Sequence, residues 1–173
     1  MTTPRDHTEI TLLVDRFFRA LDERTFTAGW GRAFFTDDIV KETPFGIFRG
    51  PEVVRATEEA VERFDRTQHM ASGVLTDQAT DADADADADP GMDAGSDTGA
   101  ESATASWDAL MTHVHHAATL RERGSGADPL FVVGGRFETE LRRTPEGWRF
   151  TRMAVRPVWT TGQPPPGIDP EMP

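Results

Sequence analysis

Three polar residues interrupt apolar segments of the chain, and their side chains are of the types that carry out acid–base chemistry. Asp22 closes the apolar face of an expected helix, His69 lies near the start of a strand-like segment at 67–75, and His113 lies within another at 105–114. Burying a carboxylate or an imidazole without a partner costs on the order of several kcal/mol. The three side chains avoid this cost if they meet in one pocket, which would then hold an acid–base site.

Each of these residues also has a purely structural interpretation. Asp22 could be a surface carboxylate beside Arg19 or Arg24, and His69 could be a buried histidine bonded to a backbone group. A carboxylate at the C-terminus of a helix opposes the helix dipole, which raises its pKa unless a cation lies near. His69 could be that cation, and this favours a pairing of the two residues.

The second histidine also belongs to a cluster of His113, His115 and His116. Two of them, His113 and His115, share a strand face and could bind a metal, although no other histidine or cysteine has ligand spacing with them. We therefore expect no metal, and we expect His115 to lie in solvent near the end of its strand. Ser72 lies near His69, but no nucleophile elbow surrounds it, and there is no glycine-rich phosphate loop.

Composition limits the class of protein. The 173 residues favour a single domain. Nine acidic residues lie within 77–101, and without them the formal charge falls from −12 to −3. No basic patch points to nucleic acid or an anionic membrane. There is no cysteine, no tyrosine, and one lysine, Lys41. Since no segment approaches the roughly 20 apolar residues of a membrane helix, we expect a soluble cytoplasmic protein.

Apolar periodicity predicts three helices in the N-terminal third. The first runs from about Thr8 to Asp22, where apolar residues recur every three or four positions. A second, short helix covers about 26–35 with Trp30 facing inward. The third begins at 50–52, where Pro51 takes an early helical position. Two short strands, 39–43 and 45–49, are expected between the second and third helices.

Four longer strands are expected after the helices, at roughly 67–77, 103–117, 129–143 and 147–160. Gly134 and Gly135 indicate a bulge or bend within the third of them. In the last strand, simple alternation places Trp148, Phe150 and Arg156 on one face. Helices followed by long antiparallel strands predict an α+β domain, in which a bent sheet wrapped around a helix encloses a ligand cavity.

The segment between the first two long strands is of low complexity. Alternating Asp and Ala fill 81–89, and no Glu stands at the offset that a calcium loop requires. We therefore expect a disordered acidic insert at about 77–102, which the flanking strands tolerate because closing a longer loop costs little. The domain is expected to span 1–161, and the proline-rich segment 162–173 to form an extended tail.

The order of several short motifs resembles the SnoaL-like branch of the nuclear-transport-factor-2-like superfamily. These motifs lie at 16–22, 35–38, 50–52, 68–70, 134–141 and 147–150, within a match over about 8–161 outside the insert. The resemblance implies a cone-shaped curved sheet closed by three helices around a ligand pocket, and homodimers formed through the sheet. Members include polyketide cyclases, steroid isomerases and scytalone- and bile-acid-type dehydratases, while many others bind ligands without known chemistry.

The resemblance also implies roles for the polar residues. In the dehydratase branch, a helix-one Asp, a His on the first long strand and a polar residue on the next strand do the acid–base work. Asp22 and His69 match the first two, and His113 is the best match for the third. The dehydratase pattern has a tyrosine five residues before the Asp, where this chain has Phe17. The phenol that polarises a substrate carbonyl is thus absent, and Arg156 or an ordered water is expected to substitute.

Together these observations predict a cofactor-independent pocket enzyme that dehydrates, isomerises or cyclises a hydrophobic, oxygenated small molecule. His69 would be the general base, Asp22 would orient it, and His113 would exchange a proton with the developing oxyanion or leaving hydroxyl. Besides Arg156, the residues expected to contact the substrate are Phe17, Trp30, Trp107, Met111 and Phe137. The alternatives are a non-catalytic ligand-binding or assembly module of the same fold, and a metal-dependent enzyme that uses His113 and His115.

Overall fold

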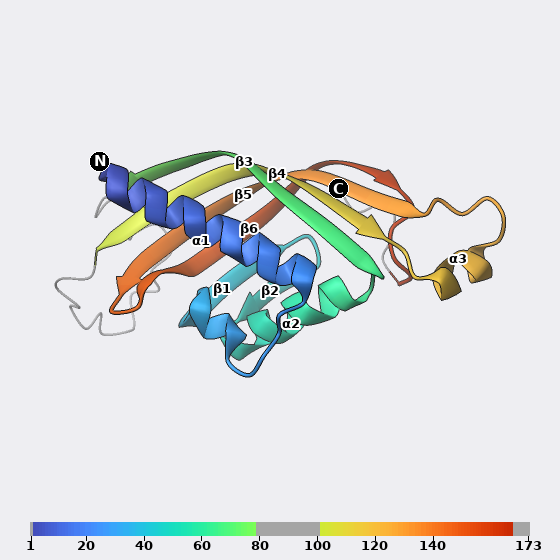
Figure 1. Cartoon of the computed structure of the whole chain (residues 1–173), viewed down its shortest axis with the longest axis horizontal. Helices are drawn as coiled ribbons and strands as arrows, with labels where there is room; N and C mark the ends of the chain where they lie inside the picture. The colour runs from blue at the N-terminus through green and yellow to red at the C-terminus, as the bar shows by residue number, and fades with distance from the viewer. Residues whose placement is uncertain (1, 79–100, 168–173) are drawn as a thin grey trace.

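The computed structural model describes residues 2–78 and 101–167. The predicted insert at 77–102 and the end of the predicted tail, from 168 onward, therefore lie almost entirely outside the described residues. Within them a long helix, α1 (Pro4–Glu23), crosses one face of a curved sheet (Figure 1). We call this covered face the inner face and the opposite one the outer face.

Helix α1 begins earlier than the apolar pattern indicates, because a capping box fixes its start. The Thr3 side chain accepts a hydrogen bond from the Asp6 backbone N–H at 3.2 Å, and Asp6 accepts one from the Thr3 N–H at 3.1 Å. Pro4 then occupies the first helical position instead of the expected Thr8. No helix in residues 2–78 and 101–167 is long and apolar enough to cross a membrane.

The α+β class is confirmed. The elements after α1 are η1 (Trp30–Ala33), β1 (Phe35–Thr43), β2 (Gly46–Arg49), α2 (Pro51–Glu62), β3 (Arg66–Gln78), β4 (Ser102–Val114), α3 (Ala117–Arg123), β5 (Leu130–Thr144) and β6 (Gly147–Gly162). The strands form one six-stranded sheet in the order β2-β1-β6-β5-β4-β3. The sheet is mixed and not purely antiparallel as predicted, because β1 runs parallel to β6. The second predicted helix is a single 3₁₀ turn, and the helix α3 was not predicted.

The core lies between α1 and the inner face of the sheet. Aromatic rings supply much of its volume, and Phe17 alone contacts four other rings, with centroids 5.5–5.9 Å apart. The largest side chains with almost no exposed surface are Trp107, Phe17, Phe150, Ile10, Ile39, Leu141, Met153, Val14 and Val53. Burial of these side chains holds α1 against the strands and fixes the direction in which its C-terminal end points.

A bulge in β6 decides which of its side chains face the core. Leu141 pairs with Phe150 and Glu140 pairs with Arg152, so Thr151 is an extra residue between two paired positions. Before the bulge Phe150 is buried on the inner face. After it the alternation is reversed, which sends Arg156 to the outer face and not to the face of Phe150 that the sequence analysis assigned.

Candidate active site

Asp22 and His69 form the central pair of the candidate site. Asp22 lies in the last turn of α1, and His69 lies on the inner face of β3. The His69 ring N–H at Nδ1 donates to Asp22 Oδ1 at 2.6 Å, and the His69 backbone N–H donates to Asp22 Oδ2 at 2.8 Å. The carboxylate thus fixes both the position of the strand and the ring tautomer. Within the described residues Nε2 has no hydrogen-bond partner, so its lone pair remains available.

The Asp22 carboxylate is half-buried but remains ionised. Burial raises its pKa, but hydrogen bonds from the His69 ring and backbone, the charge of His69 and the Thr67 hydroxyl at 2.9 Å outweigh burial, so the pKa lies below its usual value. The His69 side chain is 6% exposed and that of Asp22 is 21% exposed. An ionised, ordered carboxylate behind a nearly enclosed imidazole is the arrangement that stabilises an imidazolium during proton transfer.

His113 completes the predicted trio from the neighbouring strand. Its ring lies 5.6 Å from the His69 ring, at an interplanar angle of 88°. The His113 Nδ1–H donates to the backbone oxygen of Phe131 at 3.0 Å, which leaves Nε2 as a hydrogen-bond acceptor. Burial, with the charge of His69, lowers the pKa of His113 to about 4. At neutral pH His113 is therefore an uncharged group that accepts a hydrogen bond from a ligand.

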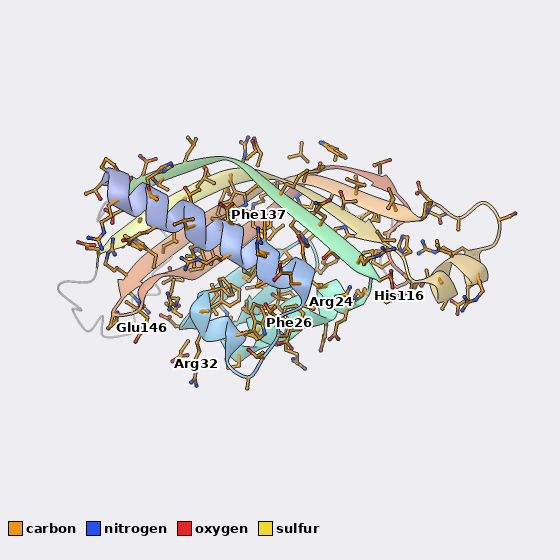
Figure 2. The ribbon with its side chains drawn as sticks, viewed as in Figure 1. Arg24, Phe26, Arg32, His116, Phe137 and Glu146 are labelled. Carbon is orange, nitrogen blue, oxygen red and sulfur yellow. The ribbon has the colours of Figure 1, made fainter. Side chains whose placement is uncertain are left out.

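Strand register brings the two histidines together. Thr67 pairs with His113 and His69 pairs with Met111, so the two imidazoles are diagonal neighbours on the inner face. The end of α1 is held over them by Arg24, whose guanidinium donates to the backbone oxygens of Val61 at 3.3 Å and of Phe64 at 2.5 Å. Figure 2 shows Arg24 where the C-terminal end of α1 approaches α2.

Some of the residues predicted to line the pocket lie near the pair and reach it through Phe18. Trp107 and Phe137 stack with centroids 5.0 Å apart, and both contact Phe18, whose ring lies 5.4 Å from that of His69. Met111, the cross-strand neighbour of His69, is also buried. Phe18, which the sequence analysis did not select, thus lies between the histidine and the stacked rings. The Trp107 indole N–H is buried and has no hydrogen-bond partner in the part of the chain that the structure describes.

Two other predicted wall residues lie in the adjoining part of the aromatic core, which reaches the histidines through rings such as Phe18, 5.9 Å from Phe17. Phe17 contacts Phe34, Phe35 and Phe150, and Trp30 contacts Phe34 and Phe35. No ring contact joins either residue to His69 or His113 among the described residues. One turn of α1 separates Phe18 from Asp22, which explains why Phe18 and not Phe17 faces the His69 ring.

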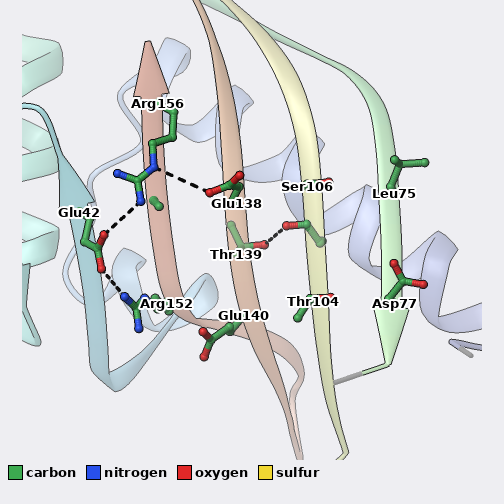
Figure 3. A pocket seen from close by; sticks show the side chains of 12 residues that line it. Glu42, Leu75, Asp77, Thr104, Ser106, Glu138, Thr139, Glu140, Arg152 and Arg156 are labelled. Carbon is green, nitrogen blue, oxygen red and sulfur yellow. Dashed lines mark hydrogen bonds and ion pairs between the residues drawn. The ribbon is translucent and has the colours of Figure 1, made fainter. Parts of the chain in front are cut away.

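Arg156 does not belong to this site. It lies on the outer face, where its guanidinium pairs with Glu42 at 3.5 Å and with Glu138 at 3.8 Å (Figure 3). There it lines a hollow of about 310 Å³, together with Arg152 and Asp77. Arg156 is thus separated from Asp22 by the sheet itself, and it does not take the place of the missing phenol.

His115 is buried and not in solvent as predicted. It follows the last residue of β4, is 2% exposed, and donates from Nε2 to the backbone oxygen of Gln163 at 2.7 Å. Its Nδ1 is enclosed without a partner among residues 2–78 and 101–167. Those residues contain no group of three or more His, Cys, Asp or Glu that could hold a metal ion.

The sequence analysis missed two residues that the structure places on the inner face. The Thr67 hydroxyl donates a hydrogen bond to the Asp22 carboxylate. The sequence could have indicated this residue, because Thr67 lies two positions before His69 and so on the same face of the strand. Lys41 lies on β1, and its ammonium group donates to the Thr57 hydroxyl at 2.9 Å. In the sequence, Lys41 is a lone lysine on the strand face that the alternation directs toward the core. Ile39, which is buried, and Thr43 lie on the same face before and after it.

The chain belongs to the SnoaL-like family, since the sequence pattern of the SnoaL-like domain matches residues 3–154. This confirms the resemblance on which the predicted fold was based. A comparison with curated protein sequences finds no match.

Several solved structures share the fold. Kfla4162 from Kribbella flavida superposes with a TM-score of 0.69 at 19% identity, covering 91% of this chain and 93% of that one. A proposed scytalone dehydratase from Novosphingobium aromaticivorans gives 0.64 at 16% identity, with 94% and 93% covered. The hexachlorocyclohexane dehydrochlorinase LinA-type3 from Novosphingobium barchaimii gives 0.59 at 17% identity, with 93% and 90% covered. At these identities the likeness shows a common fold.

Proposed function

We propose that the chain is an acid–base enzyme that removes a proton from carbon beside a carbonyl in a hydrophobic, oxygenated small molecule. The observation that carries this proposal is the contact of 2.6 Å between Asp22 Oδ1 and His69 Nδ1, reinforced by the second carboxylate oxygen on the His69 backbone. That pair leaves the Nε2 lone pair of a nearly enclosed imidazole directed away from its orienting group. The names of two fold relatives, a scytalone dehydratase and a dehydrochlorinase, are those of elimination enzymes and support the same class of reaction.

The roles of the three residues follow from their hydrogen bonds. Nε2 of His69 takes the proton, and the charge that develops on the ring is stabilised by Asp22. His113 presents Nε2 as an acceptor, so it holds a substrate hydroxyl at a fixed distance from His69. Transfer of the proton held by His69 to that hydroxyl would let it leave as water and give dehydration, and return of the proton to another carbon would give isomerisation. The apolar rings of Phe18 and Trp107 would exclude water from the reacting carbon.

Proton abstraction can be measured before the natural substrate is known. We expect the wild-type protein to accelerate hydrogen–deuterium exchange at the carbon beside the carbonyl in a panel of aryl ketones such as 1-tetralone, followed by NMR in D₂O. His69→Ala should lower the accelerated rate by about 10²- to 10⁴-fold, the usual contribution of a general base. Circular dichroism should show that the variant keeps its fold.

The matched control is His116→Ala, which removes an imidazole that is 43% exposed near the end of β4. This variant should exchange at the wild-type rate. Exchange that survives His69→Ala would contradict the proposal. Ketones that bind to the wild-type protein without any accelerated exchange would support the non-catalytic binding module instead.

A further inference from the structure

Lys41 is a partly buried cation that pairs with no carboxylate among the described residues. It is the only lysine in the chain, and it lies on the inner face of β1, opposite Met153, which has no exposed surface. Its only hydrogen-bond partner among the described residues is the hydroxyl of Thr57, a residue 3% exposed on the buried face of α2. The adjacent Glu42 points to the outer face, where it pairs with Arg152 and Arg156.

The surroundings of Lys41 favour loss of its charge. Burial alone lowers the pKa of Lys41 to about 8, and no carboxylate contributes to the shift. An enclosed ammonium group is costly unless an anion compensates it. Methionine would fill a similar volume on this strand without that cost, so the amine is poorly explained by packing. A negative charge brought by a ligand would supply the missing compensation.

Contacts along α2 connect Lys41 with the histidines. Thr57 lies on the buried face of α2, and Phe64 follows two residues after the helix ends at Glu62. The Phe64 ring lies 4.4 Å from the His113 ring, and its backbone oxygen binds Arg24 at the end of α1. The buried side of α2 and of the residues that follow it therefore extends from Lys41 to His113. Both residues therefore lie on the side of the sheet that α1 and α2 cover.

The proposed reaction also requires a donor that the trio does not provide. Removing a proton beside a carbonyl develops negative charge on the carbonyl oxygen, and this charge is stabilised by a hydrogen-bond donor or a cation. His113 is an acceptor in the tautomer fixed by Phe131, Asp22 is an anion, and Arg156 lies on the other face. Lys41 has the required charge and lies on the inner face.

We propose that Lys41 binds a negatively charged oxygen of the ligand, so that the site takes hydrophobic molecules with a carboxylate or a readily formed enolate. This inference extends the proposed function, because it assigns an anionic group to the ligand of the same site. The ammonium group would be turned by the Thr57 hydroxyl toward the oxygen, while the apolar part of the ligand would lie against the ring cluster around Phe18.

The test compares an anionic probe with an uncharged probe of the same shape. We expect 2-naphthoate to bind the wild-type protein at least tenfold more tightly than 2-naphthamide, measured by isothermal titration calorimetry. Lys41→Met should weaken 2-naphthoate binding at least tenfold and leave 2-naphthamide binding unchanged. Lys41→Gln serves as a second variant, in case methionine perturbs the fold. Arg156→Met, which removes a cation from the outer face, should retain the preference of the wild type.

Several results would overturn the proposal. In the wild-type protein, these results are equal affinity for the two probes or no binding of 2-naphthoate up to its solubility limit. In the variants, they are a preference for 2-naphthoate over 2-naphthamide that persists without Lys41, or one that is lost in Arg156→Met. Because binding is read without turnover, the outcome is separate from that of the exchange experiment. His69→Ala should keep the preference for 2-naphthoate even though it loses exchange, so each hypothesis fails on its own measurement.

Discussion

The Asp22 carboxylate holds two different groups of His69, and this double contact distinguishes a positioning residue from a surface charge. Oδ1 fixes the ring tautomer and Oδ2 fixes the backbone of the strand. A replacement that keeps the shape but removes the charge should therefore leave the strand in place and disturb the ring. Asparagine is such a replacement, because its amide retains one acceptor oxygen.

We expect Asp22→Asn to keep the fold and to lower the rate of deuterium exchange by about 10²- to 10⁴-fold, since the imidazolium loses its stabilising charge and the tautomer is no longer imposed. Asp22→Glu should recover part of the rate. The measurement is the ketone exchange assay, with folding checked by thermal unfolding. Wild-type exchange in Asp22→Asn would show that the carboxylate serves the structure alone.

Lys41 should lower the stability of the protein at neutral pH. Its pKa is about 8 in the folded chain against an ordinary 10.5, so the unfolded chain binds more protons between these values. The free energy of unfolding should therefore rise as the pH increases from about 8 to 10.5. The chain has no tyrosine, no cysteine and no other lysine, which leaves Lys41 as the only side chain that ordinarily titrates in this range.

We expect Lys41→Met to raise stability at pH 7 by about 1 kcal/mol, or about 2–4 °C in Tm for a chain of this length. The variant should also lose the rise in stability above pH 8. Urea unfolding at pH 7, 8, 9 and 10 measures both effects, and Arg156→Met is the control for removal of an exposed cation. A pH dependence that is the same with and without Lys41 would contradict the assignment of its pKa.

At the scale of elements, the site depends on how α1 is joined to α2. Arg24 ends α1 in a left-handed conformation with φ of 51°, and its guanidinium reaches the backbone oxygens of Val61 and Phe64. These contacts place Asp22 over β3 and keep Phe64 against His113. The end of α1 is thus bound to the end of α2 by one side chain.

We expect Arg24→Ala to lower the free energy of unfolding by about 1–3 kcal/mol, because two backbone oxygens lose a charged donor. Arg24→Ala should also lower the rate of deuterium exchange by more than the loss of folded protein accounts for. Arg16→Ala is the matched control, since Arg16 is exposed and, among the described residues, bonds only the oxygen of Leu12 within the same helix. Denaturant unfolding and the exchange assay provide the two readings, and equal effects of both variants would contradict this role.

The same scale explains what the sequence could predict. Periodicity was sufficient for the buried faces of α1 and α2, but the start of α1 depended on a capping box. The pairing of Asp22 with His69 was predicted from the cost of burying polar groups and from the family resemblance. Periodicity failed at Arg156, since one extra residue at Thr151 reverses the alternation of β6 and nothing in the local composition marks a bulge there. It also missed α3: the strand predicted at 103–117 ends at Val114 in the structure, and α3 begins at Ala117. Lys41 was visible as the only lysine, but its lack of a counter-ion depends on contacts with α2.

At the scale of the molecule, the outer face of the sheet carries an exposed apolar row. Met70 pairs with Leu110, Leu110 with Gly134, and Gly134 with Trp159, so the row crosses four strands. Met70 and Trp159 are each 50% exposed, and the Trp159 indole lies over Gly134, where a Cβ atom would collide with it. Such a row on one face is typical of a surface that another molecule covers.

We propose that a second copy of this chain covers that row, forming a homodimer through the two outer faces. The flanking charges have both signs, with Arg136 paired to Asp108 on the same face, so a two-fold arrangement can place opposite charges together. Trp159→Glu should convert the dimer to a monomer in size-exclusion chromatography with light scattering. Ile47→Glu is the control, because Ile47 is 60% exposed on β2 and lies outside the row. A wild-type protein that is monomeric at micromolar concentration, or a Trp159→Glu variant that remains dimeric, would contradict this arrangement.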